Sequence, residues 1–139
     1  MYLKTRVLNI LRCYPFSLLV TGVIIYLSLF NFETDNLPKI TNLDKIAHFL
    51  MYGGFCSIVW LEYLLTHNNL NFWKVFFGAL VSPIIFSGAM EVAQLLLTKN
   101  RSGDIYDFIF NVLGIVAATI FSLYVVRPLI TKYKRERQN

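Results

Sequence analysis

The stretch Glu91–Gly114, EVAQLLLTKNRSGDIYDFIFNVLG, predicts two apolar helices joined by a short polar connection. Polar side chains recur on both helices at helical spacing. Glu91 and Gln94 lie three residues apart, so they share one face of the first helix. Spacings of three and four residues place three side chains on one stripe of the second: Asp104, Asp107 and Asn111. Because a carboxylate at the centre of a membrane-spanning helix costs roughly 2.5–3.5 kcal/mol, these groups indicate a site.

The connection between the two helices adds a cation. Arg101 falls in this turn, beside the acids of both helices. Gly114 follows Asn111 by three residues and would allow another helix to approach closely. We therefore expect Arg101 to belong to the same site as the acids.

The composition sets the class of protein. The chain has 139 residues, of which 56% are hydrophobic and 16% aromatic, and its long apolar runs are separated by short polar segments. This pattern is typical of an integral membrane protein. We predict an all-α fold, a single domain over residues 1–139, with a short interfacial helix before the first span. Four transmembrane helices, each near the roughly 20 residues that cross a bilayer, are predicted at about 15–32, 45–65, 72–97 and 106–126.

The basic residues predict the topology. The net charge is +5, and the basic residues gather before the first span and after the last. By the positive-inside rule both termini are cytoplasmic, which predicts a multi-pass protein of the cytoplasmic (inner) membrane. Nothing resembles a nucleic-acid-binding module, so no nucleic-acid partner is expected. Glu62 would then lie near the cytoplasmic border, where we expect it to snorkel or to face the following loop.

A second polar stripe begins at the start of the second span. Asp44, His48 and Tyr52 follow one another at spacings of four residues, and Lys45 is adjacent. The stripe ends at Gly53 and the neighbouring Gly54, which would allow tight helix packing.

Depth in the membrane brings the stripes to one level. In the predicted topology the second helix starts, the third ends and the fourth starts at the outer surface. From the helical rise, His48, Glu91 and Asn111 then lie roughly 6, 9 and 10 Å from those helix ends. Without water, polar groups at one depth of the membrane have the lowest free energy when they are buried against one another and form hydrogen bonds. The sequence therefore predicts a polar pocket open to the extracytoplasmic face.

These segments resemble the VanZ-like family, named after a protein associated with teicoplanin resistance. The family pattern is Asp-Lys-x-x-His-Phe-x-x-Tyr on one helix, Glu-x-x-Gln on the next, and Arg, Asp and Asn-x-x-Gly at the last. The chain matches it over about half of its length with Asp44, Lys45, His48, Phe49, Tyr52, Glu91, Gln94, Arg101, Asp104, Asp107, Asn111 and Gly114. The resemblance implies a membrane-embedded protein linked to lowered susceptibility to a lipoglycopeptide antibiotic that binds cell-wall precursors. It implies no particular reaction.

Two functional interpretations use these residues directly. In the first, cations and amide donors bind an anionic lipid headgroup, a lipid-linked cell-wall precursor or the lipoglycopeptide itself, with no covalent step. The ligand-binding candidates are Asp44, Lys45, Tyr52, Gln94, Arg101, Asp104 and Asn111. In the second, a membrane-embedded hydrolase or transferase acts on a lipid-linked substrate, with His48 and Glu91 or Asp107 as acid and base. The second needs more assumptions, because no motif identifies a nucleophile.

Two further interpretations remain. A proton-linked transporter or flippase would need a polar site at the inner leaflet and an internal repeat, and the sequence shows neither. In a purely structural interpretation, Asp44 and Asp104 cap helix starts and Glu91 forms an ion pair with Arg101.

The same residues are also candidates for a metal site. One histidine and several carboxylates can bind a divalent cation, but Lys45 and Arg101 would repel it, and no HExxH or multi-histidine motif is present. The sequence thus favours no metal and no cofactor. Cys13 and Cys56 lack a CxxC partner, and we expect both to be structural.

Overall fold

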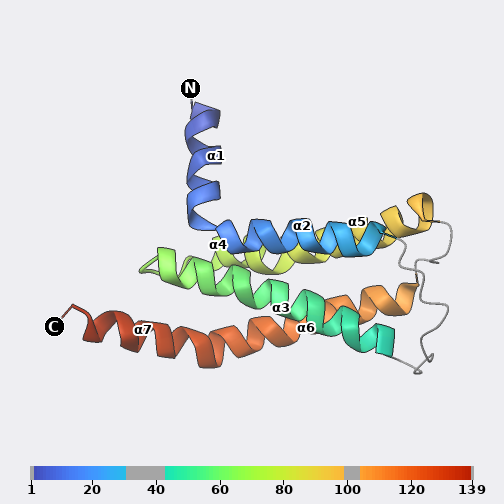
Figure 1. Cartoon of the computed structure of the whole chain (residues 1–139). Coiled ribbons are helices and arrows are strands. Elements are labelled where there is room, and N and C mark those ends of the chain that lie inside the picture. Colours follow the sequence, from blue (N-terminus) through green and yellow to red (C-terminus); the bar gives the residue numbers. More distant parts are fainter. Residues whose placement is uncertain (1, 31–42, 99–103, 139) are drawn as a thin grey trace.

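The computed structural model describes residues 2–30, 43–98 and 104–138, and every regular element in them is a helix (Figure 1). Of residues 2–7 it describes the backbone alone. In chain order, with η for π-helical turns, the elements are α1 (Tyr2–Cys13), α2 (Pro15–Leu29), α3 (Leu43–Thr66), α4 (Phe72–Val75), η1 (Phe76–Val81), α5 (Ser82–Leu97), α6 (Ile105–Phe121), η2 (Ser122–Val126) and α7 (Arg127–Glu136). α4, η1 and α5 form one continuous helix, and so do α6, η2 and α7.

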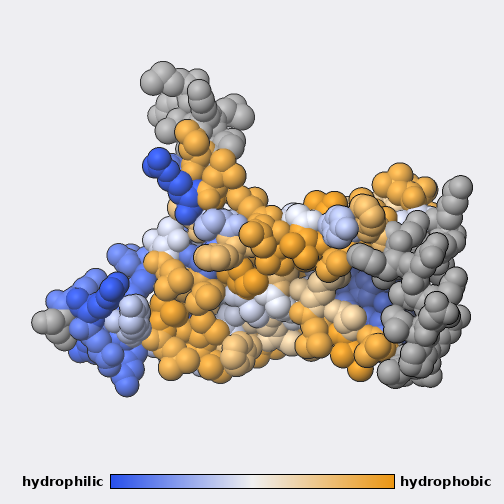
Figure 2. All heavy atoms as spheres, viewed as in Figure 1, coloured by the Kyte–Doolittle hydropathy of each residue, from blue (hydrophilic) through white to orange (hydrophobic). Residues whose placement is uncertain are grey.

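The described helices have the length and composition of a membrane protein. Three continuous helices could cross a bilayer: Leu43–Thr66 with 24 residues, Phe72–Leu97 with 26 and Ile105–Glu136 with 32. Hydrophobic residues cover most of the visible bundle surface, and hydrophilic residues gather at its C-terminal end (Figure 2). The prediction of an all-α membrane bundle is confirmed.

Two helices differ in length from the spans predicted for them. α2 is apolar but has 15 residues, about 22 Å at the helical rise and less than the roughly 30 Å of hydrocarbon. The predicted span 15–32 extends past the described residues at its end. The last helix continues ten residues beyond Val126, through α7. The helix continues past Pro128, which follows the π-helical turn η2, and the basic side chains beyond it favour helix while staying solvated.

α1 leaves the bundle at a steep angle to α2 (Figure 1). The bend falls at Tyr14, whose φ of −132° and ψ of 47° are not helical, and Pro15 begins α2. A residue before proline is disfavoured in the α region, whereas proline is well suited to a first helical position. This orientation is the one that the predicted interfacial helix requires.

Two glycines bring α3 and α6 together. The two helices run in the same direction side by side and share the largest contact in the molecule (Figure 1). A Cβ atom on Gly114 would collide with the backbone carbonyl oxygen of Phe49, and one on Gly53 would lie 3.2 Å from the Gly114 carbonyl oxygen. Gly54 is exposed and meets nothing within 4 Å. The expected tight packing therefore holds for Gly53 and Gly114 and fails for Gly54.

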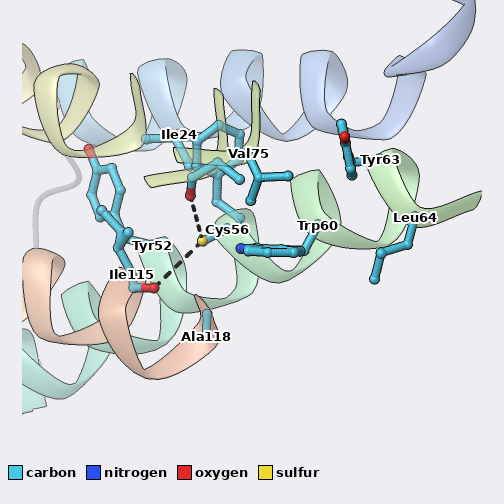
Figure 3. Close-up of a cluster of buried hydrophobic side chains, with 11 residues drawn as sticks. Ile24, Tyr52, Cys56, Trp60, Tyr63, Leu64, Val75, Ile115 and Ala118 are labelled. Carbon is cyan, nitrogen blue, oxygen red and sulfur yellow. Dashed lines mark hydrogen bonds between the residues drawn. The ribbon is translucent and has the colours of Figure 1, made fainter. Parts of the chain in front are cut away.

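Cys56 of α3 lies at the centre of the hydrophobic core, where it faces η1 and α6. Its sulfur is 3.1 Å from the Ala79 carbonyl oxygen and 3.6 Å from that of Ile115 (Figure 3). Ala79 lies four residues before Pro83, which has no N–H to donate to that carbonyl. The thiol thus satisfies a polar group of the helix beside it, in agreement with a structural role.

Glu62 does not snorkel or face the loop. It is 6% exposed, and its carboxylate accepts hydrogen bonds from the Phe16 amide at 2.7 Å, from the Ser17 amide at 3.0 Å and from the Ser17 hydroxyl. The first N–H groups of a helix lack partners within it, so a carboxylate from α3 completes the start of α2. This contact fixes α2 to α3 at the end of the bundle nearest the C-terminus.

Candidate functional site

The site lies at the end of the bundle away from the C-terminus. There α3 begins, α5 ends and α6 begins (Figure 1). Each of these helix ends carries polar residues of the predicted stripes, and the structure brings His48, Glu91, Asp107 and Asn111 together.

A hydrogen-bonded chain crosses from α5 to α3 through α6. The Nδ2 amide of Asn111 donates to Glu91 Oε1 at 3.0 Å. The other end of the same amide, Oδ1, lies 3.0 Å from His48 Nδ1. Asn111 is fully buried, and the side chains of His48 and Glu91 are 8% and 11% exposed. Asn111 is therefore the central link between two titratable groups.

This chain determines which nitrogen of His48 carries hydrogen. The NH2 group of Asn111 faces Glu91, and its carbonyl oxygen faces His48. A carbonyl oxygen requires a donor, so Nδ1 of His48 is protonated. In the neutral ring, Nε2 then carries a lone pair on the far side.

Two more carboxylates face Nε2 of His48. Asp107 Oδ2 is 3.8 Å away, and Asp44 Oδ1 is 3.9 Å away. Asp107 is buried, whereas the Asp44 side chain is 69% exposed. Each of the three residues offers one atom to a group that could hold a metal ion.

Lys45 and the cap residue Asp104 make contacts outside the hydrogen-bonded chain. Lys45 places Nζ 5.1 Å from the centre of the Tyr106 ring. Asp104 is the N-cap of α6 and accepts from the Tyr106 amide at 2.9 Å, which matches the capping role considered for it. Arg101 lies outside the described residues, so its predicted place in the site stays a prediction.

Gln94 and Tyr52 are buried near the cluster without joining its hydrogen-bonded chain. Gln94 Nε2 donates to the Ser28 carbonyl oxygen at 3.2 Å and so links α5 to α2. Tyr52 belongs to the hydrophobic core, with its ring tilted against Phe86 at 6.2 Å between centres. The sequence does not reveal Ser28 as a partner of Gln94, because a backbone carbonyl that accepts a hydrogen bond leaves no signal in the sequence.

Two cavities reach this end of the molecule. One, of about 220 Å³, is lined by Asp44, His48 and Gln94 together with residues of α2. The other, of about 330 Å³, lies between α5 and the start of α6 and is lined by Gly88, Glu91, Val92, Leu95, Asp104, Ile105 and Phe108. Val92 and Ile105 are exposed on the apolar surface of the bundle. This second cavity, the α5/α6 groove, thus has apolar walls and two carboxylates.

The comparisons with known proteins give one match. The profile of the VanZ/LLP1 family matches residues 4–127. No curated protein and no solved structure matches the chain.

Proposed function

This chain belongs to the VanZ/LLP1 family, and from its site we propose that it binds the headgroup of an anionic lipid or of a lipid-linked cell-envelope precursor. Binding would take place on the extracytoplasmic side of the cytoplasmic membrane, with both termini in the cytoplasm. The resemblance to VanZ implies a link to glycopeptide (teicoplanin) resistance. A lipoglycopeptide antibiotic is therefore a further candidate ligand, because it also joins an acyl chain to a polar head.

The α5/α6 groove carries this proposal. Its walls include Val92, Leu95 and Phe108, and its polar lining is Glu91 and Asp104. An amphiphile that lies in the membrane can place its chain against the apolar wall while its head reaches the polar cluster. Glu91 connects the two regions, because it lines the groove and accepts the hydrogen bond from Asn111.

A second function has an observation in its favour. The chain from Glu91 through Asn111 to His48 holds the imidazole in one orientation, with Nε2 directed at Asp44 and Asp107. A histidine held in this way is typical of acid–base catalysis. The alternative is a membrane-embedded hydrolase or transferase on a lipid-linked substrate, in which His48 and Glu91 or Asp107 exchange the proton.

Native mass spectrometry of protein extracted gently from its own membrane tests the binding function. Val92→Trp fills the groove at a position that is 55% exposed, and Leu96→Trp adds the same ring on the same helix at a position that is 74% exposed and outside the groove. We expect wild type and Leu96→Trp to retain the same lipid and Val92→Trp to lose it. Equal lipid profiles for all three proteins would contradict binding in the groove.

The lipid that is found then separates binding from catalysis. With that lipid as substrate, an enzyme would release product, and His48→Ala would abolish turnover. For a protein that only binds, His48→Ala would weaken lipid retention, and wild type would leave the lipid intact.

A further inference from the structure

The sign of the charge in the cluster conflicts with an anionic ligand. The described residues of the cluster and its rim carry four acids, Asp44, Glu91, Asp104 and Asp107, against the ammonium group of Lys45. That ammonium lies 5.1 Å from the centre of the Tyr106 ring. A headgroup with negative charge would meet a negative site in a low-dielectric environment, where like charges repel strongly. Arg101, the cation predicted for this site, lies outside the described residues; among the described residues, a bound cation would offset this charge.

The environment of His48 Nε2 indicates where such a cation would lie. The separations of 3.8 and 3.9 Å from the two aspartates exceed the roughly 2.7–3.2 Å of an N–H···O hydrogen bond. Among the described residues, no other group offers Nε2 a hydrogen bond. The nitrogen belongs to a side chain that is 8% exposed, and it is directed at the space between the two carboxylates. Among the described residues, a proton on Nε2 would find no acceptor at bonding distance, whereas an ion between the three atoms would have three ligands.

The spacing of the three atoms fits a metal ion. They lie within 4.8 Å of one another. A point equidistant from three donors with these separations is roughly 2.1–2.5 Å from each, a range that overlaps the bond lengths of zinc, about 2.0–2.2 Å, and calcium, about 2.3–2.6 Å. The imidazole suits Zn²⁺, and the two carboxylates also suit Mn²⁺.

The hydrogen-bonded chain behind His48 supports the same assignment. Histidines that bind a metal usually donate their second N–H to a carboxylate or carbonyl group, which fixes the tautomer and the ring orientation. His48 donates Nδ1–H to Asn111, which in turn is held by Glu91. The nitrogen that is left to bind a metal is Nε2, the one that faces Asp44 and Asp107.

We propose that His48, Asp107 and Asp44 bind a divalent metal ion of the Mn²⁺ or Zn²⁺ type, with open coordination positions for the phosphate or carboxylate oxygens of the headgroup. The positions would open to the cavity of about 220 Å³ that Asp44 and His48 line. That cavity shares no lining residue with the α5/α6 groove, which would then hold only the chain of the lipid. The bound ion reverses the local charge and bridges an anionic ligand to an acidic site. The proposal that the site binds a metal does not depend on the proposed function. The role of the metal in headgroup binding rests on that function.

Metal content is the test of this proposal. The full-length protein in detergent is stripped with EDTA, incubated with MnCl2 or ZnCl2, separated from free metal by gel filtration and analysed by elemental mass spectrometry. Wild type is expected to retain about one equivalent of one of the two metals and to gain thermal stability from it. Asp107→Asn and the exposed Asp44→Asn are each expected to weaken binding at least about tenfold. Glu136→Gln removes an exposed carboxylate from α7 and should bind as wild type does.

Several outcomes would overturn the metal site. They are the absence of both metals from wild type after gel filtration, the absence of a stability gain with either metal, and undiminished binding by Asp44→Asn. The Asp44 side chain is 69% exposed, so this variant tests the site even if Asp107→Asn does not fold. The lipid bound before and after EDTA separates the two proposals. Lipid retained after EDTA would leave the proposed function standing and refute the role of the metal in headgroup binding. Metal bound by a protein that carries no lipid would support the metal site and refute the proposed function.

Discussion

At the scale of single residues, Asn111 holds the site together. It is fully buried and satisfies both a carboxylate oxygen of Glu91 and the Nδ1–H of His48. Glu91 Oε2 is buried and has no hydrogen-bond partner among the described residues, so the carboxylate depends on Asn111. A buried amide of this kind cannot be replaced without leaving two polar groups unpaired.

We therefore expect Asn111→Leu to destabilise the protein. Each buried polar group that loses its partner costs about 1–3 kcal/mol, whereas a surface change is usually within about 0.5 kcal/mol. Unfolding of the purified protein by a denaturing detergent measures the difference in the free energy of unfolding between each variant and wild type. Asn69→Leu, at an exposed position of the loop before α4, is the control. A cost for Asn111→Leu no larger than that of the control would show that His48 and Glu91 do not depend on Asn111 as their hydrogen-bond partner.

At the scale of helices, the close contact of α3 and α6 places His48 against Asn111. Gly114 lies one turn beyond Asn111 on α6, and a methyl group there would meet the Phe49 carbonyl of α3. The helix backbone cannot move aside as a flexible side chain would, so the two helices would have to separate. Separation would also lengthen the contact between His48 and Asn111.

Gly114→Ala should cost about 1–3 kcal/mol from overpacking, although alanine is the better helix former. Gly54→Ala is the matched control, because a Cβ there meets nothing within 4 Å and the change should be neutral or stabilising by up to about 1 kcal/mol. The melting temperatures of the two variants in the same detergent provide the comparison. Equal melting temperatures would contradict the close helix contact.

α2 is held at its start by Glu62. The change Glu62→Gln replaces two accepting oxygens by one and directs an NH2 group at the donors of Phe16 or Ser17. Because hydrogen bonds to a charged group contribute about 1.5–3 kcal/mol, the start of α2 should open more often. Hydrogen exchange at Phe16 and Ser17 should accelerate about tenfold or more, while exchange in α6 stays unchanged. Unaltered exchange at these two amides would argue against the cap.

The sequence predicted some of these features and not others, for physical reasons. Periodicity shows which side chains share a helix face, and the depth of each stripe placed His48, Glu91 and Asn111 at one level. Periodicity does not show which helix start a buried carboxylate will cap. The sequence therefore predicts that Glu62 snorkels or faces the loop, whereas in the structure it caps the start of α2. Periodicity also cannot predict that Gln94 bonds a backbone carbonyl of α2, or that Lys45 lies over Tyr106.

At the scale of the whole molecule, the site and the basic C-terminal helix lie at opposite ends of the bundle (Figure 1). If the positive-inside rule holds for this chain, the site faces the extracytoplasmic side. Single cysteines test this in a background of Cys13→Ser and Cys56→Ala. A membrane-impermeant maleimide should label Asp44→Cys in intact cells and Lys134→Cys only after permeabilisation. Labelling in the opposite order would invert the topology and place the site in the cytoplasm.

The central claim is that the polar cluster binds a ligand and is not needed for the protein to fold. Buried polar and charged groups can often be replaced together by apolar groups with little loss of stability. A triple variant, His48→Leu, Glu91→Met and Asn111→Leu, would remove the whole chain of hydrogen bonds at once. We expect it to fold with a melting temperature near that of wild type.

The most direct test is the lipid that this triple variant carries, determined by native mass spectrometry beside wild type. The account predicts that wild type retains a specific lipid and that the equally folded variant retains none of it. The same lipid on both proteins, in the same amount, would contradict the claim.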